Sequence, residues 1–166
     1  MKLNTISTST IEAIISRNEL IDNINNFKTS DLALISISEP LHQHYEDEQL
    51  PNSICNLFDN YLKVKFWDIE EDFLHYKIIS NEIAKEIQDF ILENNKQNKR
   101  FLVHCRAGQS RSAAVGKSIE CLKYFGIGEE AKYNYQTNFN SEIDAHTRYH
   151  PNLTVFDKIV KDYSNN

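Results

Sequence analysis

The run from His104 to Ser112 constrains this chain more than any other stretch of its sequence. It places a cysteine, Cys105, and an arginine, Arg111, six positions apart, between an apolar run and a helical pattern. A strand, a tight loop and a helix in this order put the cysteine near a helix start. Unpaired backbone N–H groups there bind anions and favour the ionised thiol. The run therefore predicts an anion-binding loop around a nucleophilic sulfur.

The residues around this loop support the predicted order of strand, loop and helix. Phe101-Leu102-Val103 predicts a short buried strand, and residues 110–124 predict a helix that stops at Gly126. Gly108 lies in the middle of the loop, where the backbone must turn tightly and bring no Cβ toward a ligand. If Cys105 were only a core cysteine beside an unrelated arginine, the chain would not need a strand, a glycine in the loop and a helix in this order. Small residues would let the helix pack closely on a sheet: Ala113, Ala114 and Gly116.

Strand and helix patterns alternate along the chain, which predicts an α/β fold with one central, mostly parallel sheet of about four or five strands flanked by helices. Ligands of such sheets bind beyond the carboxyl ends of the strands, which is where Cys105 falls. Residues 5–17 are ambiguous, and we expect a short strand followed by a helix that carries Ile11, Ile14 and Ile15. The other predicted strands are 32–38 and 61–66, and the other predicted helices are 17–27, 80–94, 129–138 and 151–163.

Length and composition predict a single globular domain over residues 1–166, since 40% of the residues are hydrophobic and 25% are charged. Three cysteines are too few for a disulfide scaffold and indicate a reducing, cytoplasmic location. We expect no signal peptide and no membrane span, because no apolar run approaches about 18 residues. The net charge of −6 argues against binding to nucleic acid or anionic membranes, and we expect a monomer.

The motif His-Cys-x5-Arg-Ser at 104–112 resembles the signature of the cysteine-dependent protein tyrosine phosphatase superfamily. The chain length and the position of the motif resemble the small dual-specificity-like branch. Weaker similarities at 34–38, 65–69 and Pro151-Asn152-Leu153 extend the resemblance over residues 30 to 165. The resemblance implies the phosphatase fold, with its phosphate-binding loop between strand and helix. It also implies hydrolysis of phosphotyrosine, and in some members phosphoserine or phosphothreonine, in a partner protein.

The residues of the loop have distinct roles in this chemistry. Cys105 would attack phosphorus to give a cysteinyl-phosphate, and Arg111 would hold two phosphate oxygens with its planar fork. By resemblance, His104 orients the loop and helps to keep the thiol ionised, and the Ser112 hydroxyl donates to the sulfur. A serine that only begins the helix is the alternative for Ser112. Backbone N–H groups would bind the other oxygens, from Arg106, Ala107, Gly108, Gln109, Ser110 and Arg111.

Asp68 is the best candidate for the general acid that an alkoxide or phenolate leaving group requires. It lies 37 residues before Cys105, directly after a strand, and by resemblance it holds the acid position of the small phosphatases. We expect Trp67 and Ile69 to desolvate it in part and so favour its protonated form. A merely solvated acidic loop is the alternative. Three acidic residues in the same run compete with it, Asp72 first: Glu70, Glu71 and Asp72.

No metal or cofactor is predicted for this chemistry. His42 and His44 form a pair next to acidic residues, but no cysteine or further histidine is near them in sequence, so an exposed polar loop is favoured over a metal site. Cys55 and Cys121 are expected to be buried core residues, although Cys121 is in principle available to pair with an oxidised Cys105.

The neutral residues of the loop favour a protein substrate. Of the variable positions only Arg106 is charged, whereas superfamily members that act on phosphoinositides tend to carry more Lys or Arg. An inositol phosphate or a nucleotide stays open as the substrate. Two further classes of protein compete with the phosphatase: a phosphate-binding module without turnover, and a rhodanese-like or arsenate-reducing thiol enzyme. The presence of Cys105, Arg111-Ser112 and Asp68 together favours the phosphatase.

Overall fold

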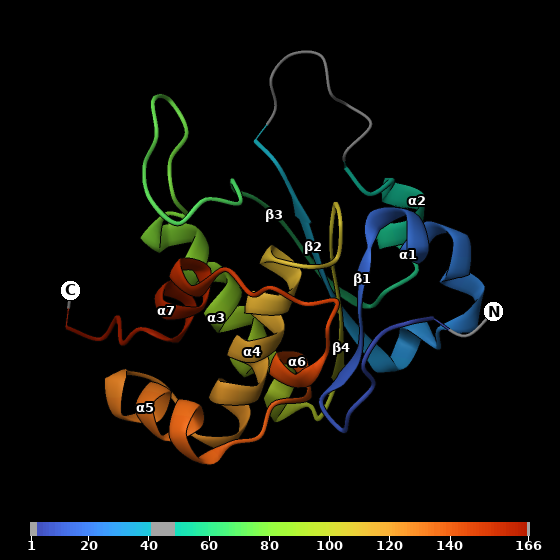
Figure 1. Ribbon diagram of the computed structural model, residues 1–166. Helices are drawn as coiled ribbons and strands as arrows, with labels where there is room; N and C mark the ends of the chain where they lie inside the picture. The colour runs from blue at the N-terminus through green and yellow to red at the C-terminus, as the bar shows by residue number, and fades with distance from the viewer. Residues whose placement is uncertain (1–2, 41–48, 166) are drawn as a thin grey trace.

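The computed structural model describes residues 3–40 and 49–165. All neighbouring strands of its sheet run parallel, in the order β1-β4-β2-β3. The carboxyl ends of the strands therefore meet at one edge, the upper edge in Figure 1. This confirms the predicted α/β fold with a parallel sheet flanked by helices. Four strands form the sheet within the described residues: β1 (Ile11–Ser16), β2 (Leu32–Ser38), β3 (Asn60–Lys65) and β4 (Arg100–Cys105).

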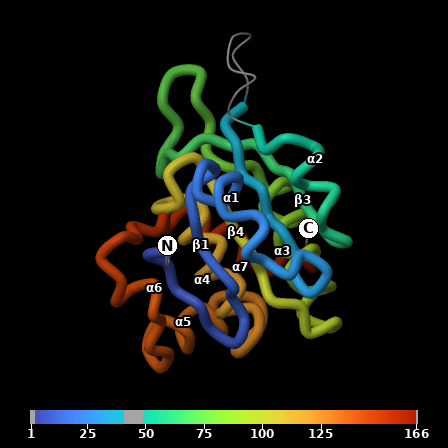
Figure 2. Tube along the Cα trace, turned by 90° about the vertical axis from the view of Figure 1, so that its right-hand side faces the viewer, coloured from blue at the N-terminus to red at the C-terminus, as the bar shows by residue number. Residues whose placement is uncertain are grey.

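Helices cover both faces of the sheet (Figures 1 and 2). Successive side chains of a strand point to opposite faces, so β1, β2 and β4 contribute to two separate cores. The larger core lies under α3 (Asn81–Lys96), α4 (Arg111–Tyr124) and α7 (Leu153–Val160). The smaller core lies under α1 (Arg17–Asn23) and α2 (Asn52–Cys55). Two further helices follow α4, namely α5 (Glu129–Asn138) and α6 (Glu142–Ala145).

Close packing of α4 on the sheet depends on its small residues, as the sequence predicts. Ala113 and Ala114 are fully buried. A Cβ added at Gly116 would lie 2.5 Å from Ile14 Cδ1 and 3.0 Å from Ile143 Cδ1. The helix therefore lies directly against β1, and its first turn is brought to the carboxyl edge of the sheet.

The expected helix over Ile11, Ile14 and Ile15 is wrong, because these residues form β1. A strand buried on both faces has a continuous apolar run, and such a run does not distinguish a strand from a helix. The helix predicted at 17–27 ends earlier, at Asn23, and a 3₁₀ turn at Ile24–Asn26 follows it. The last helix is also shorter than predicted and covers Leu153–Val160.

The predicted polar loop with His42 and His44 lies mainly outside the described residues. The sequence predicts this surface loop over residues 42–52, and its described part differs from the prediction, since Leu50 is buried in the smaller core and α2 follows it. Within residues 3–40 and 49–165 we find no helix with the length and apolar character that a bilayer crossing requires.

Candidate active site

Cys105 is the last residue of β4 and lies at the carboxyl edge of the sheet, where Ser16 of β1 is its register partner. Its side chain is buried, and its Sγ atom is 3.1 Å from the hydroxyl oxygen of Ser112 in the first turn of α4. Ser112 is itself fully buried. The structure thus brings together the proposed nucleophile and the hydroxyl expected to donate to it, while their roles stay predictions.

The carbonyl oxygens of the loop after Cys105 are held from outside by neighbouring segments. In a trans peptide the C=O and the following N–H point in opposite directions. The N–H groups of residues 107, 109, 110 and 111 therefore point away from these outer donors and into the loop. Four hydrogen bonds hold the carbonyls: Arg17 N to Arg106 O (3.4 Å), Arg148 Nε to Gly108 O (3.3 Å), His150 N to Gln109 O (2.9 Å) and Asn152 N to Ser110 O (3.4 Å).

Gly108 lets the loop lie flush against the end of β1. Its φ of +66° is in the left-handed region that favours glycine. An added Cβ would lie 2.3 Å from the carbonyl carbon of Ile15 and 2.4 Å from the nitrogen of Ser16. The tight turn is confirmed, but its reason differs from the expected one: the backbone of β1, and not a ligand, excludes a side chain here.

The Arg111 guanidinium lies between the ends of β2 and β3. Nη1 donates to the carbonyl oxygen of Phe66 at 3.0 Å, and Nη2 is 3.5 Å from Oε1 of Glu39. The side chain is buried, and its Nε has no hydrogen-bond partner among the described residues. Glu39 was not predicted as a site residue. Its position directly after a buried strand is the sequence signal that would have indicated it.

Asp68 lies beside the end of the loop that follows Cys105. Its Oδ1 accepts hydrogen bonds from Ser110 Oγ at 2.7 Å and from Asn152 Nδ2 at 3.0 Å. The residue is exposed, so the predicted desolvation by Trp67 and Ile69 is wrong. The two hydrogen bonds turn the carboxylate toward Ser110 and Asn152, which are both polar.

Asp72, the next candidate for the acid, is engaged within its own loop. Its Oδ1 accepts from the backbone nitrogen of Ile78 at 2.9 Å, and its Oδ2 is 3.3 Å from Lys77 Nζ. The hydrogen bond from Ile78, followed by the Lys77 contacts, lowers the pKa of Asp72. These contacts favour Asp68 over Asp72 as the group that faces the loop after Cys105.

His104 is fully buried next to Cys105 and connects β4 with β2. Its Nε2 is 2.7 Å from the hydroxyl oxygen of Ser36. Burial lowers the pKa of His104 from 6.5 to about 4, so the imidazole is neutral near pH 7. The contact with Ser36 suits a residue that orients the end of β4. Because the imidazole is neutral, it supplies no positive charge that would stabilise a thiolate on Cys105.

The other cysteines are buried in the two cores, as predicted. Cys55 belongs to the smaller core and Cys121 to the larger one, where burial raises the pKa of Cys121 to about 11. His42 and His44 lie outside the described residues. Elsewhere in the described parts of the chain, no group of three or more His, Cys, Asp or Glu side chains is placed to hold a metal ion.

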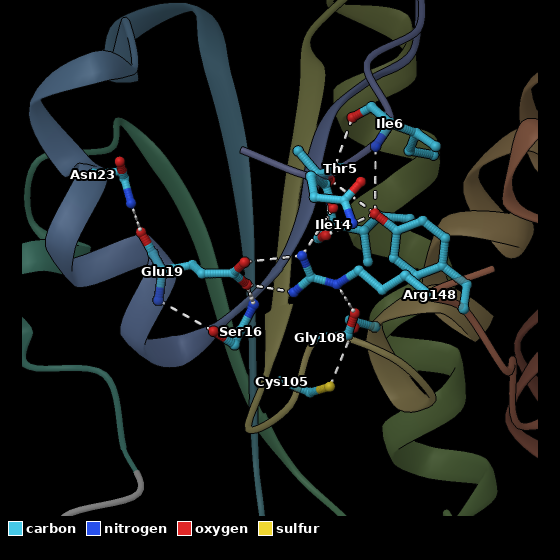
Figure 3. Close-up of polar contacts among 12 residues, drawn as sticks. Thr5, Ile6, Ile14, Ser16, Glu19, Asn23, Cys105, Gly108 and Arg148 are labelled. Carbon is cyan, nitrogen blue, oxygen red and sulfur yellow. Dashed lines mark hydrogen bonds and ion pairs between the residues drawn. The ribbon is translucent and has the colours of Figure 1, made fainter. Parts of the chain in front are cut away.

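Sequence reasoning missed the ion pair between Arg148 and Glu19, which lies against the outer side of the loop (Figure 3). The two residues are far apart in the chain, so no local spacing indicates the pair. Arg148 stands close to Asp144-Ala145-His146 and to the Pro151-Asn152 motif in sequence, but neither of them indicates its partner.

No protein-family model and no curated protein matches this chain in sequence. Solved structures do match it. The human tyrosine phosphatase-like serine/threonine/tyrosine-interacting protein matches with 20% identity and a TM-score of 0.50, over 87% of this chain and 82% of that one. OH1 from the Orf virus, described as a tyrosine phosphatase with triple substrate specificity, matches with 14% identity and a TM-score of 0.58, over 94% and 83%.

PTPMT1, solved in complex with PI(5)P, matches with 12% identity and a TM-score of 0.55, over 92% of this chain and 88% of that one. These structural neighbours include a protein described as a tyrosine phosphatase and one described as tyrosine phosphatase-like, and the chain has their fold. Identities this low show the fold alone and leave the chemistry to be argued from the site.

Replacing Gly108 with Ala should lower the free energy of unfolding by about 3 kcal/mol or more, because it combines backbone strain with a clash against β1. Gly126→Ala is the matched control: Gly126 also has a positive φ, +99°, but nothing lies within 4 Å of an added Cβ. Strain alone should cost about 1 to 2 kcal/mol there. Urea unfolding measures both, and equal losses would contradict the close approach of the loop to β1.

Because the folded protein keeps His104 neutral, we expect its free energy of unfolding to be lower in mild acid than near pH 7. The unfolded chain, with an ordinary histidine pKa near 6.5, binds more protons than the folded chain between about pH 4 and 6.5. The free energy of unfolding should therefore fall by up to about 3 kcal/mol as the pH falls through this window. His104→Gln should flatten this dependence in urea unfolding. A variant with the same slope as the wild type would show that other groups cause it.

Proposed function

We propose that this chain hydrolyses phosphate monoesters through a cysteinyl-phosphate intermediate on Cys105. One observation carries the proposal: a buried thiol lies at the start of a loop whose carbonyl groups are held outside and whose N–H groups therefore face inward. Inward N–H groups at the start of α4 suit a dianion of the size of phosphate. The Arg111 guanidinium completes the positive side of this site.

In the first step the Cys105 thiolate attacks phosphorus. The S–P bond forms while the bond from phosphorus to the leaving oxygen breaks, and that oxygen takes a proton from Asp68. Arg111 binds two of the other phosphate oxygens and gives up its contact with Glu39. The position of Asp68 supports this step, because Ser110 and Asn152 hold it at the rim of the same loop.

In the second step the Asp68 carboxylate takes a proton from water, and the water oxygen attacks phosphorus. The S–P bond breaks, Cys105 leaves as a thiolate and inorganic phosphate is released. The Ser112 hydroxyl donates to the departing sulfur across the 3.1 Å contact. His104 keeps the end of β4 in place through Ser36 and takes no part in the proton transfers.

The substrate is a phosphorylated protein, with phosphotyrosine as the first choice and phosphoserine or phosphothreonine next. The exposed residues of the loop support this choice, since Arg106 carries the one charge there and Ala107 and Gln109 are neutral. Several cationic side chains on the loop would bind a polyphosphate substrate more favourably than one does. The three free, buried cysteines suit a reducing cytoplasm, and we propose residues 1–166 as a single catalytic domain.

The central test is hydrolysis of para-nitrophenyl phosphate by reduced protein in the presence of EDTA. The wild type should turn over without a metal, and Cys105→Ser should reduce kcat by about a thousandfold or more. Cys121→Ala, which alters another buried thiol, should keep its activity. A folded wild type without turnover, or with turnover that EDTA abolishes, would sink the proposal. Phosphotyrosyl and phosphoseryl peptides and an inositol phosphate then separate the substrate classes.

The acid role of Asp68 predicts a dependence on the leaving group. Asp68→Asn should reduce kcat/KM about a hundredfold for phenyl phosphate, whose poor leaving group needs the proton, and much less for para-nitrophenyl phosphate. Asp72→Asn is the control and should leave both substrates unaffected. The same loss for both substrates would indicate that Asp68 acts only by holding Ser110 and Asn152.

A further inference from the structure

An ion pair links α1 to the segment between α6 and α7, on the outer side of the catalytic loop (Figure 3). Arg148 Nη1 donates to Oε1 of Glu19 at 2.9 Å, and Nη2 contacts Oε2 of the same carboxylate. The Arg148 side chain is only 12% exposed. A two-point contact of this kind fixes the plane of the guanidinium as well as its position.

Glu19 is itself held in place by the start of α1. Its Oε2 accepts from the backbone nitrogen of Ser16 at 2.7 Å, and its own nitrogen donates to Ser16 Oγ at 3.1 Å, which completes a capping box. Ser16 ends β1 as the register partner of Cys105. The carboxylate is thus fixed to the strand that lies beside the nucleophile.

The segment that carries Arg148 is anchored on its other side. The next residue, Tyr149, is buried, and its hydroxyl donates to the carbonyl oxygen of Ile14 at 2.9 Å. Arg148 Nη1 also donates to the carbonyl oxygen of Asn4 at 3.0 Å. Both N–H groups of Nη1 and one of Nη2 are thereby engaged, and Nε faces the loop.

Arg148 Nε donates to the carbonyl oxygen of Gly108 at 3.3 Å. Gly108 has no freedom to move toward β1, since its Cα already lies against the backbone of Ile15 and Ser16. With the carbonyl held by Arg148, the planar peptide directs the N–H of Gln109 to the opposite side, into the loop.

We propose that Arg148, fixed by Glu19, is a positioning residue that holds the Gly108 carbonyl outside the catalytic loop and so aims the Gln109 N–H at the bound phosphate. This inference rests on the proposed function of the same loop. An arginine is needed because one planar group must donate to Glu19, Asn4 and Gly108 in three directions. A lysine offers a single nitrogen and cannot span these acceptors.

The test compares Arg148→Lys and Glu19→Gln with wild type, by calorimetric binding of tungstate as a phosphate-like anion and by kcat and KM for para-nitrophenyl phosphate. Arg148→Lys should weaken tungstate binding about tenfold and lower kcat/KM between about tenfold and a hundredfold. Glu19→Gln keeps the side-chain shape but loses the charge, and should weaken binding in the same direction to a smaller extent.

Arg100→Lys is the matched control. Arg100 also pairs with a carboxylate, that of Glu12, and donates to the carbonyl oxygens of Thr8 and Ile11, but it begins β4 at the opposite edge of the sheet. Its replacement should lower the unfolding temperature and leave tungstate affinity and KM unchanged. A loss of affinity in the Arg148 and Glu19 variants beyond that of the control would support a positioning role over a merely structural one.

The two proposals fail in different ways. Folded Arg148→Lys and Glu19→Gln proteins that bind tungstate like the wild type would overturn the positioning role and leave the phosphatase proposal standing. If Arg148→Lys does not fold, the isosteric Glu19→Gln variant decides by the same measurement. A folded wild type that neither binds tungstate nor hydrolyses the ester would remove both proposals together.

Discussion

The close approach between the backbone of Gly108 and the end of β1 is the constraint on which the candidate site depends. Backbone atoms of Ile15 and Ser16 occupy the space that any side chain would need. The loop can lie this close to β1 only with a glycine at this position, and the surrounding segments hold its carbonyl groups so that its N–H groups point inward. An anion cradle built this way is preorganised, because the N–H groups are aimed by packing and not by the ligand.

Parallel strand order gives this loop its neighbours. Because the carboxyl ends of all strands share one edge, the residues directly after each strand gather around Cys105. Glu39 follows β2 and Phe66 follows β3, and both contact Arg111. The start of α1 follows β1 and brings Glu19 to the outer side of the loop. The site is thus a product of topology, assembled from positions spread over most of the chain.

Because the site combines local elements with contacts between distant residues, the sequence predicts only the local elements. The strand, loop and helix around Cys105 are local, and their bounds follow from apolar runs, Gly108 and small residues. The sequence predicts a helix where the structure has the strand Ile11–Ser16, because burial on both faces removes the alternating pattern of a strand. Contacts such as Arg148 with Glu19 join residues 129 positions apart, and no spacing or motif encodes them. The first 30 residues carry no motif that predicts a role, and the contact of Glu19 with Arg148 arises only in the folded arrangement.

The two arginines at the loop are held in opposite ways, and the difference matches their proposed tasks. Arg111 has one carboxylate neighbour at 3.5 Å and a buried Nε without a partner among the described residues. The guanidinium is already desolvated in the folded protein, so binding a phosphate dianion does not require its burial again. A dianion in place of Glu39 would give Arg111 stronger hydrogen bonds, including one to its Nε. Arg148 has a two-point contact with Glu19 and further backbone acceptors. A side chain held so firmly cannot follow a substrate, but it can keep the loop fixed while Arg111 does.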